Sequence, residues 1–425
     1  MDAINIAQDG SLAEMPQWRH RAAIDLPRKD VRKRILFVDH TAALGGGEIA
    51  LLNLVRYLDP SRFRAIVLLF SEGPLAVKLR DAGVETHVLG LDQSVTSTRK
   101  DTIGIRTLLR VGVVLPALRQ VIRLRRFICD QQIDVVHANS LKADIIAGLA
   151  ARWARVPLIW HVRDRITADY LPSPVVWAFR FLARRVPTMV IANSAATLHT
   201  LQLKPTQPAA VVYSGIELKS ETISPLFHDP SHAPLIGLIG RITRWKGQDV
   251  FLRAAAEVLQ RFPQARFQII GAALFQEQDF EREIKNLTRE LGLEAAVEFT
   301  GFRSDVSELI EHLDILVHAS TTGEPFGQVV VEGMAAGKAV VATDGGGVPE
   351  IVVPDETGIL VPMGDAEALA RGICRLLESP QRALEMGRRG RSRVESLFTI
   401  QHTVAKMESL YDSMPAAGRA GAPAH

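Results

Sequence analysis

The sequence predicts an α/β protein made of two Rossmann-like domains. The chain has 425 residues, 47 % of them hydrophobic, which is more than one ordinary core accommodates and enough for two. Short β-branched runs alternate with longer helical patterns from Ile35 onward, which indicates parallel, buried strands. An aperiodic segment rich in Ser, Pro and His, residues 214–234, divides this alternation into two series and is expected to be a linker.

The first domain is expected at residues 34–213, after a flexible tail at 1–33. That tail has acidic residues and lacks a long apolar run, so it resembles neither a secretory signal nor an anchor. Residues 106–128 are expected to form a helix that is broken near Pro116. The expected strands are 35–39, 65–69, 84–89, 134–137, 158–161, 189–192 and 210–213.

The second domain is expected at residues 235–395. It is followed by a C-terminal helix at 396–414, which can cross back to the first domain, and by a flexible tail at 415–425. Cys129 and Cys374 lie too far apart in sequence for a metal site or a disulfide framework, so a reducing cytosol is the expected location. The expected strands are 235–239, 267–270, 297–300, 315–318 and 339–342.

The loop after strand 235–239 reads GRITRWKG and brings Arg241 and Lys246 together. Open α/β sheets bind ligands at the carboxyl ends of their strands, where this loop lies. Two cations there suit a diphosphate, because an Arg guanidinium binds it with two hydrogen bonds and a Lys acts as a point charge. An ordinary exposed loop is the alternative.

After strand 315–318 comes the stretch TTGEPFGQVVVEGMAAGKAVVATDGGG. Pro325 and Gly327 open a helix in this stretch. Its N-terminal amides, from Phe326 to Gln328, are expected to point into a cleft with partial positive charge suited to phosphate.

Two glutamates flank the start of that helix, Glu324 before it and Glu332 eight residues later. Glu332 lies among apolar residues, and a carboxylate there needs hydroxyl or amide donors because burying it unpaired is costly. Bonding to neighbouring protein amides is the alternative to a ligand. A third loop, residues 300–306, is expected to wall a nucleobase with Phe302.

The runs GRITRWKG and GEPFGQVVVEGMAAGKAVVATDGGGVPEIV resemble the donor-binding domain of the family 4 retaining glycosyltransferases. The spacing of Glu324 and Glu332 is similar to that family's paired-glutamate motif, and the match spans most of residues 235–410. The resemblance implies the GT-B architecture, in which two Rossmann-like domains face each other across a cleft. It also implies transfer of a hexose from a nucleotide-diphosphate sugar to a glycan or polyprenyl-linked acceptor, in bacterial-type polysaccharide or glycolipid assembly.

By the same resemblance, Glu324 contacts hydroxyls of the donor sugar and Glu332 binds the nucleotide ribose. Arg241 and Lys246 match the phosphate-binding pair, and they would stabilise the diphosphate leaving group as a metal does elsewhere. The sequence contains no Asp-x-Asp pair, so neither a metal nor any cofactor beyond the donor is expected.

The loop after the first strand carries Gly45, Gly46 and Gly47 directly before an amphipathic helix. Glycines permit close backbone approach to a ligand, and a helix N-terminus favours its phosphate. The loop lacks the Gly-x-Gly-x-x-Gly dinucleotide pattern, so a plain tight turn is the alternative. The resembled family has a similar glycine-rich loop, and we therefore expect a donor contact here.

Two histidines, His137 and His161, end strands on the same predicted edge. Such residues are often satisfied within the protein. The resemblance assigns to His161 a position that reaches the donor sugar and the reaction centre. The role of His137 stays open, because the family often has another histidine where this chain has Asn139.

Retention of configuration follows from the resemblance. No obvious second carboxylate accompanies Glu324 as a nucleophile, which favours front-face attack with the departing phosphate taking the acceptor's proton. One alternative is a nucleotide-sugar epimerase or a phosphorylase on the same fold. Another is an NAD-dependent oxidoreductase or a non-catalytic nucleotide-binding module, which the missing glycine pattern and the two glutamates disfavour.

Charge is distributed unevenly along the chain. Up to residue 230 there are 30 Lys and Arg against 21 Asp and Glu, and afterwards 20 against 26. Within residues 99–126 there are eight basic residues and one acidic residue, interleaved with apolar ones such as Val121 and Leu124. We expect this segment to contact an anionic membrane surface, with the apolar side packing on the sheet as the alternative. The expected location is cytoplasmic and peripheral on the inner face of the membrane, with no nucleic-acid partner.

Overall fold

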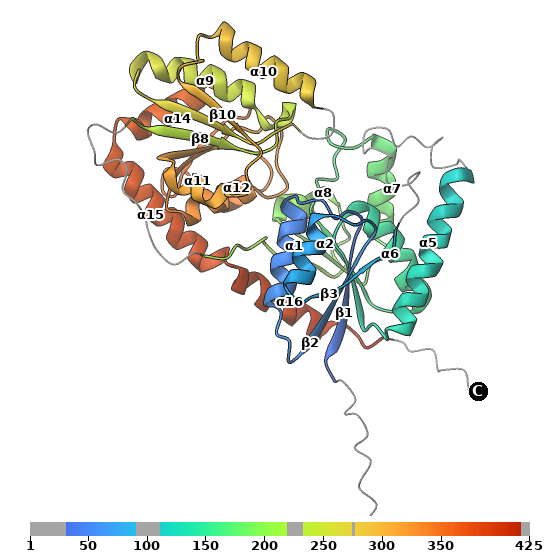
Figure 1. Ribbon diagram of the computed structural model, residues 1–425. Coiled ribbons are helices and arrows are strands. Elements are labelled where there is room, and N and C mark those ends of the chain that lie inside the picture. Colours follow the sequence, from blue (N-terminus) through green and yellow to red (C-terminus); the bar gives the residue numbers. More distant parts are fainter. Residues whose placement is uncertain (1–30, 91–110, 219–232, 274–276, 418–425) are drawn as a thin grey trace, which may run out of the picture.

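The computed structural model describes residues 31–90, 111–218, 233–273 and 277–417. These residues fold into two α/β domains, each built on one parallel sheet with helices on both faces (Figure 1). The fold class predicted from the sequence is therefore confirmed.

The first sheet has the strand order β3-β2-β1-β4-β5-β6-β7. Its strands are β1 (Lys33–Asp39), β2 (Phe63–Leu69), β3 (Glu85–Val88), β4 (Val135–Ala138), β5 (Leu158–Val162), β6 (Met189–Ala192) and β7 (Ala209–Val211). One face is covered by α5 (Val111–Asp130), α6 (Leu141–Ala154) and α7 (Ser173–Ala183). The other is covered by α1 (Gly46–Tyr57), α2 (Pro74–Asp81) and α16 (Ile400–Ser413), and the short α8 (Ala195–Thr200) follows β6.

The second sheet has the strand order β10-β9-β8-β11-β12-β13. Its strands are β8 (Leu235–Ile239), β9 (Arg266–Ile270), β10 (Val297–Gly301), β11 (Ile315–His318), β12 (Ala339–Thr343) and β13 (Ile359–Val361). Helices α9 (Gln248–Arg261), α10 (Gln278–Glu290) and α14 (Ala366–Leu377) cover one face. Helices α11 (Val306–His312), α12 (Gln328–Ala335) and α13 (Val348–Ile351) cover the other, and α15 (Pro380–Leu397) follows α14.

The strands follow from short apolar runs that are buried on both faces. In β1 the four residues from Ile35 to Val38 are all fully buried, as expected for a parallel strand covered by helices on each side. All twelve strands expected from the sequence are present, with ends within two residues. Strand β13 was not expected, because its three residues between Gly358 and Pro362 are too few to display a period.

The expected break near Pro116 is wrong. Helix α5 runs unbroken from Val111 to Asp130 with Pro116 inside it. A proline removes one main-chain hydrogen bond and crowds the carbonyl four residues earlier, which here belongs to Gly112. The remaining bonds of the helix and the burial of Leu124 and Ile128 against the sheet offset this cost.

The apolar side of α5 also differs from the expectation of a lipid-facing surface. Val121 and Leu124 are 5 % and 0 % exposed and belong to the core beneath the helix, together with Leu36 and Ile66. Residues 99–110 of the expected membrane segment lie outside the described residues. Across the described ranges, no helix combines the length and apolarity needed to cross a membrane.

The last helix, α16, belongs to the first domain although it follows the second in sequence. Its buried side chains lie in one core with Ile35 and Phe37 of β1. Figure 1 shows this helix beneath the first sheet, reached from α15 on the second domain. Tyr411 anchors it, because its ring contacts Phe37 and Phe63 and its hydroxyl lies 2.7 Å from Nδ1 of His137.

We expect Tyr411→Ala to lower the free energy of unfolding by about 3–5 kcal/mol, the usual cost of removing a buried aromatic ring. Tyr411→Phe keeps the ring and removes only the hydroxyl that pairs with Nδ1 of His137, so the loss should be about 1–3 kcal/mol. Urea unfolding measures both, with the exposed Lys406→Ala on the same helix as control. A loss below 1 kcal/mol for Tyr411→Ala would contradict the anchoring role.

Candidate functional site

Each sheet reverses its strand order at one point, between β1 and β4 in the first and between β8 and β11 in the second. At such a point the connections from two neighbouring strands diverge, which leaves a crevice at the carboxyl edge of the sheet. Polar side chains gather at both crevices. The candidate site is therefore sought at the loops after these four strands and their neighbours.

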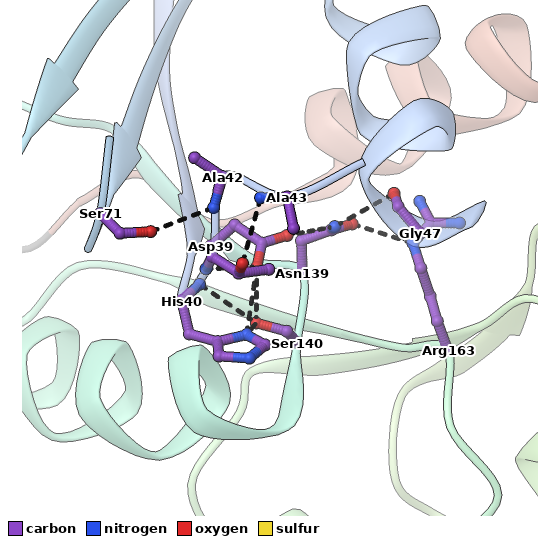
Figure 2. A network of polar contacts seen from close by, with 10 residues as sticks. Asp39, His40, Ala42, Ala43, Gly47, Ser71, Asn139, Ser140 and Arg163 are labelled. Carbon is purple, nitrogen blue, oxygen red and sulfur yellow. Dashed lines mark hydrogen bonds and ion pairs between the residues drawn. The ribbon is translucent and has the colours of Figure 1, made fainter. Parts of the chain in front are cut away.

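In the first domain the crevice is held together by Asp39 at the end of β1 (Figure 2). Its buried carboxylate accepts hydrogen bonds from Nδ2 of Asn139 at 2.7 Å and from Oγ of Ser140 at 2.9 Å. Oγ of Ser140 also lies 2.8 Å from Nδ1 of His40. Since Asn139 and Ser140 follow β4, this network ties the loop after β1 to the loop after β4.

The three glycines lie where the sequence predicts, at the N-terminus of α1. Gly45 precedes the helix and provides no side-chain cap. A Cβ on Gly47 would lie 3.3 Å from Cδ of Arg163, so the loop approaches this arginine closely. Burial raises the pKa of Glu48 in the first helical turn, and the nearby Asp39 raises it further. The Glu48 carboxylate also accepts a hydrogen bond from its own backbone N–H. The loop thus brings the N-terminus of α1 and a guanidinium to one place.

Arg163, one residue beyond β5, is held by three partners. Its Nε donates to Oδ1 of Asn139 at 2.9 Å, and its terminal nitrogens lie 2.8 Å from Oγ of Ser214 and 3.4 Å from Nδ1 of His161. Burial lowers its pKa to about 10, although the Asp39 and Glu48 carboxylates counteract this, so it stays a cation at neutral pH. The sequence interpretation did not single out this residue.

His161 lies in β5, two residues before Arg163, and its side chain is 1 % exposed. Because Arg163 can only donate, Nδ1 of His161 is the acceptor, and Nε2 of His137 at 3.1 Å must carry a proton. Nδ1 of His137 then accepts from the Tyr411 hydroxyl. Burial, with the Arg163 charge second, holds the pKa of His161 well below its usual range, so the ring is neutral. Its buried Nε2–H has no partner among the described residues.

In the second domain, Glu324 is the centre of the crevice. Its Oε1 accepts hydrogen bonds from Nζ of Lys246, from Nε2 of His318 at 2.8 Å and from Oγ of Ser320 at 2.6 Å. Nδ1 of His318 lies 3.1 Å from Oγ1 of Thr343, which fixes the ring. Oε2 of Glu324 has no hydrogen bond within the described part of the chain.

The Glu324 carboxyl is buried, and burial by itself raises its pKa. The Lys246 charge and the His318 hydrogen bond outweigh burial and hold that pKa well below its usual range. Glu324 is therefore an anion at neutral pH, with one oxygen held by Lys246, His318 and Ser320 and the other without a partner among the described residues.

Glu332, one turn along α12, lines a cavity of about 960 Å³ between the domains. Gln328 and Ile310 line it from the second domain, and Ile49 and Asn53 of α1 from the first. Burial raises the pKa of Glu332 to about 7, although a hydrogen bond with Gln328 and the Lys246 charge act in the opposite direction. The Gln328 hydrogen bond and the Lys246 charge therefore do not compensate the burial of this carboxyl.

The other residues predicted to bind the sugar donor lie in different environments. Gly327 precedes α12 at φ 118° and provides no side-chain cap, so the first N–H groups of the helix stay uncapped. Phe326 is 3 % exposed and packs in the core, so only its backbone can meet a ligand. Arg241 is exposed after β8, and Phe302 is 73 % exposed beyond β10.

The loop that carries Glu324 also contacts the first domain. The Gly323 carbonyl accepts a hydrogen bond from Nη1 of Arg165 at 2.9 Å, and the Pro325 carbonyl accepts one from Oγ1 of Thr197 at 2.9 Å. Oγ of Ser194 donates to the Pro325 carbonyl as well. The two crevices therefore face each other, and these hydrogen bonds join the two domains beside them.

Sequence reasoning missed His318 and Ser320, which satisfy Glu324. His318 ends a buried strand at the ligand edge, which is the signal that singled out His161. Arg163 gave no comparable local signal, because its role depends on Asn139 and Ser214 from other loops. Throughout the residues described, no group of three or more His, Cys, Asp or Glu side chains could hold a metal ion.

The chain matches two sequence families over adjoining segments. Residues 44–220 match the family described as Glycosyltransferase Family 4, and residues 221–393 match Glycosyl transferases group 1. Among solved structures, the Anabaena protein Alr3699/HepE in complex with UDP and glucose has a TM-score of 0.76 at 28 % identity. That similarity covers 90 % of this chain and all of the Anabaena chain, which has also been solved with UDP-glucose.

Curated relatives match over shorter segments. The lipopolysaccharide core biosynthesis mannosyltransferase LpcC of Rhizobium leguminosarum is 29 % identical over 55 % of this chain and 67 % of its own length. The putative glycosyltransferase EpsD of Bacillus subtilis is 36 % identical over 40 % of this chain and 42 % of its own length. The chain thus spans less than half of the second relative.

We expect Glu332→Gln to change the pH dependence of stability. In the folded protein the pKa of this carboxyl is about 7, whereas in the unfolded chain it is the ordinary 4.5. The protonated carboxyl therefore contributes its full stabilisation below pH 4.5, and this stabilisation is lost as pH rises through 7. Above pH 7 the variant should therefore be more stable than wild type, and near pH 4.5 the two should be equal. Thermal unfolding across pH tests this, with the exposed Glu290→Gln as control. A constant difference at every pH would contradict it.

Proposed function

Because the chain belongs to the family 4 glycosyltransferases of GT-B fold, with a group 1 domain as its second half, we propose that it is a retaining, metal-independent hexosyltransferase. Its donor is a nucleotide-diphosphate hexose and its acceptor a glycan or polyprenyl-linked glycan. The observation that carries the proposal is the pair of facing crevices, with helix N-termini, cations and the half-satisfied Glu324.

The nucleoside is proposed to occupy the cavity lined by Gln328 and Glu332. A carboxyl whose pKa is raised to about 7 by burial gains most from hydroxyl donors, and a ribose supplies two of them. The complexes of the Anabaena protein with UDP and UDP-glucose support a uridine donor as the first to test. Phe302 and the loop around it are proposed to flank the base.

The diphosphate is proposed to lie between Arg241, Lys246 and the N-termini of α1 and α12. Gly45, Gly46 and Gly47 supply close backbone approach from the first domain, and Arg163 adds a cation beside them. Positive charges that are already in position stabilise the leaving diphosphate without rearrangement of the site. In other enzymes a metal ion has this role.

In the proposed reaction the bond from the anomeric carbon to the phosphate oxygen breaks, and the diphosphate leaves with the electron pair. The acceptor hydroxyl adds from the same face, and its proton passes to the leaving phosphate. Oε2 of Glu324 accepts from a sugar hydroxyl, and Nε2–H of His161, which has no partner among the described residues, donates to the sugar. No step requires a second carboxylate as nucleophile.

We propose that the first domain attaches to the cytoplasmic face of an anionic membrane. This attachment would bring the lipid-linked acceptor close to the first domain. The residues that support it differ from those expected from α5 alone. Six large apolar side chains are exposed along the outer surface of the three helices on one face, namely Leu118, Ile145, Leu149, Trp153, Trp177 and Phe181. Ile145, Leu149 and Trp153 are spaced by four on α6 and form one stripe.

Arginines flank these apolar residues. The Arg125 guanidinium lies 4.8 Å from the Trp153 ring centre, and that of Arg185 lies 3.9 Å from the Phe181 ring centre. Aromatic side chains beside cations suit the headgroup region of an anionic bilayer, where apolar and charged groups are solvated together. We call the six apolar residues with their flanking arginines the helical face.

We expect transfer from one member of a panel of UDP-, GDP- and ADP-hexoses in the presence of a chelator. Lys246→Ala should lower kcat by about 10²-fold, since it removes a charge that stabilises the leaving group. The exposed Arg241→Ala tests the same role with less risk to folding. Arg244→Ala, whose guanidinium pairs with Glu283 at the surface, is the control.

Two outcomes would contradict the proposal. Activity that a chelator abolishes and magnesium restores would overturn the metal-independent mechanism. Epimerisation of the nucleotide sugar without an acceptor, or phosphorolysis of a glycan, would favour the alternative epimerase or phosphorylase function.

We expect the protein to float with vesicles that contain an anionic phospholipid and not with neutral ones, and salt should weaken this binding. Leu149→Ser combined with Trp153→Ser should lower the bound fraction at least tenfold. Val77→Ser, an exposed apolar position on the opposite face of the same domain, is the matched control. Equal binding to neutral vesicles, or no effect of the double variant, would remove the helical face as the membrane contact.

A further inference from the structure

A glutamate of the second domain binds the start of a helix in the first. The carboxylate of Glu350, on α13, accepts hydrogen bonds from the backbone N–H groups of Ala195 and Ala196, each at 2.8 Å. These are the first two residues of α8, so their N–H groups have no partner inside the helix. A negative charge at this end also meets the positive end of the helix dipole.

The same end of α8 binds the loop of Glu324. Ser194 and Thr197 donate through their hydroxyls to the carbonyl of Pro325, the residue after Glu324. On the other side, N–H of Gly347 donates to the carbonyl of Glu324 at 2.9 Å, three residues before Glu350. The contacts form a closed circuit from Glu324 through Pro325, α8 and α13 back to Glu324.

Tyr213, which follows β7, strengthens this circuit. Its hydroxyl donates to Oε2 of Glu350 at 3.1 Å, and its ring stacks on Phe326 with centroids 5.7 Å apart. Burial raises the pKa of this tyrosine and the Glu350 charge raises it further, so the hydroxyl keeps the proton that it donates. Oε2 therefore receives two donors and Oε1 one, all three from the first domain.

We propose that Glu350 is a positioning residue. It keeps the loop of Glu324 docked on the first domain and thereby sets the separation of the two crevices. The inference rests on the proposed sugar transfer for its kinetic consequence. Most of the proposed nucleotide contacts, such as Glu332 and Lys246, lie within the second domain and do not need the circuit. Those from α1 and Arg163 do, so nucleotide binding should depend on the circuit less than transfer does. Transfer needs groups from both domains in register, because a small displacement of a reacting group strongly reduces the rate.

The test compares Glu350→Gln and Glu350→Ala with wild type and with Glu356→Gln, an exposed glutamate in the loop after α13. A neutral amide can accept one N–H but repels the second, so both Glu350 variants should break the circuit. We expect kcat to fall at least tenfold, about 1.4 kcal/mol, while the Kd of the nucleotide diphosphate rises by no more than about threefold, because the first domain supplies only part of its contacts. The control should match wild type in both.

A second measurement does not depend on activity. Hydrogen exchange at the N–H groups of Ala195 and Ala196 should accelerate at least tenfold in Glu350→Gln, since they lose their acceptor. Thr197→Val should reduce kcat in wild type but add little in the Glu350→Gln background, because both changes open one circuit.

These measurements separate the possible failures. Unchanged exchange at Ala195 and Ala196, or additive effects of Thr197→Val, would overturn the positioning role. Equal losses in nucleotide affinity, kcat and melting temperature would reduce Glu350 to a structural contact and would also overturn it. If no hexose transfer is found with any donor, the proposed function fails, and the exchange experiment still decides whether Glu350 holds the domains together.

Discussion

The ion pair between Lys246 and Glu324 is the interaction on which the rest of the site depends. It joins the loops after β8 and β11, where the second sheet reverses its strand order. A buried carboxylate without a partner is strongly destabilising, so the position of Lys246 determines the conformation of the Glu324 loop. His318 and Ser320 complete the partners of one oxygen. The loop then turns the carbonyls of Gly323 and Pro325 toward the first domain.

The first domain meets this loop with a network of its own. Asp39, Asn139 and Arg163 tie together the ends of three neighbouring strands, and the glycine-rich loop lies against Arg163. Helix α16 also contacts this network, because Tyr411 pairs with His137, which in turn pairs with His161 beside Arg163. Both crevices thus combine cations with helix N-termini, which is the arrangement that a diphosphate between two domains requires. Residues 44–220 and 221–393 match two glycosyltransferase families, and the Anabaena protein of similar fold has been solved with UDP-glucose.

Local sequence was sufficient for every strand of the first sheet and for all but β13 of the second. Parallel strands buried on two faces are short apolar runs, so β1 and β12 are recognisable without knowledge of their neighbours. Gly45 to Gly47, Lys246 and Glu324 were also predicted, because the loops after strands meet at one edge of the sheet. The pattern failed where it was too short, as in β13, or where a breaker was tolerated, as at Pro116 in α5.

The sequence by itself determined which segments are strands, which faces of helices are apolar and which loops carry charge at the ligand edge. Only the tertiary structure decided what covers each face and which distant groups meet. The apolar side of α5 packs on the sheet, His137 meets Tyr411 across 274 positions, and Glu350 caps a helix 155 positions away. The pKa of Glu332 depends in the same way on burial between elements. Periodicity records the polarity of a surface, whereas these contacts depend on how the chain returns on itself.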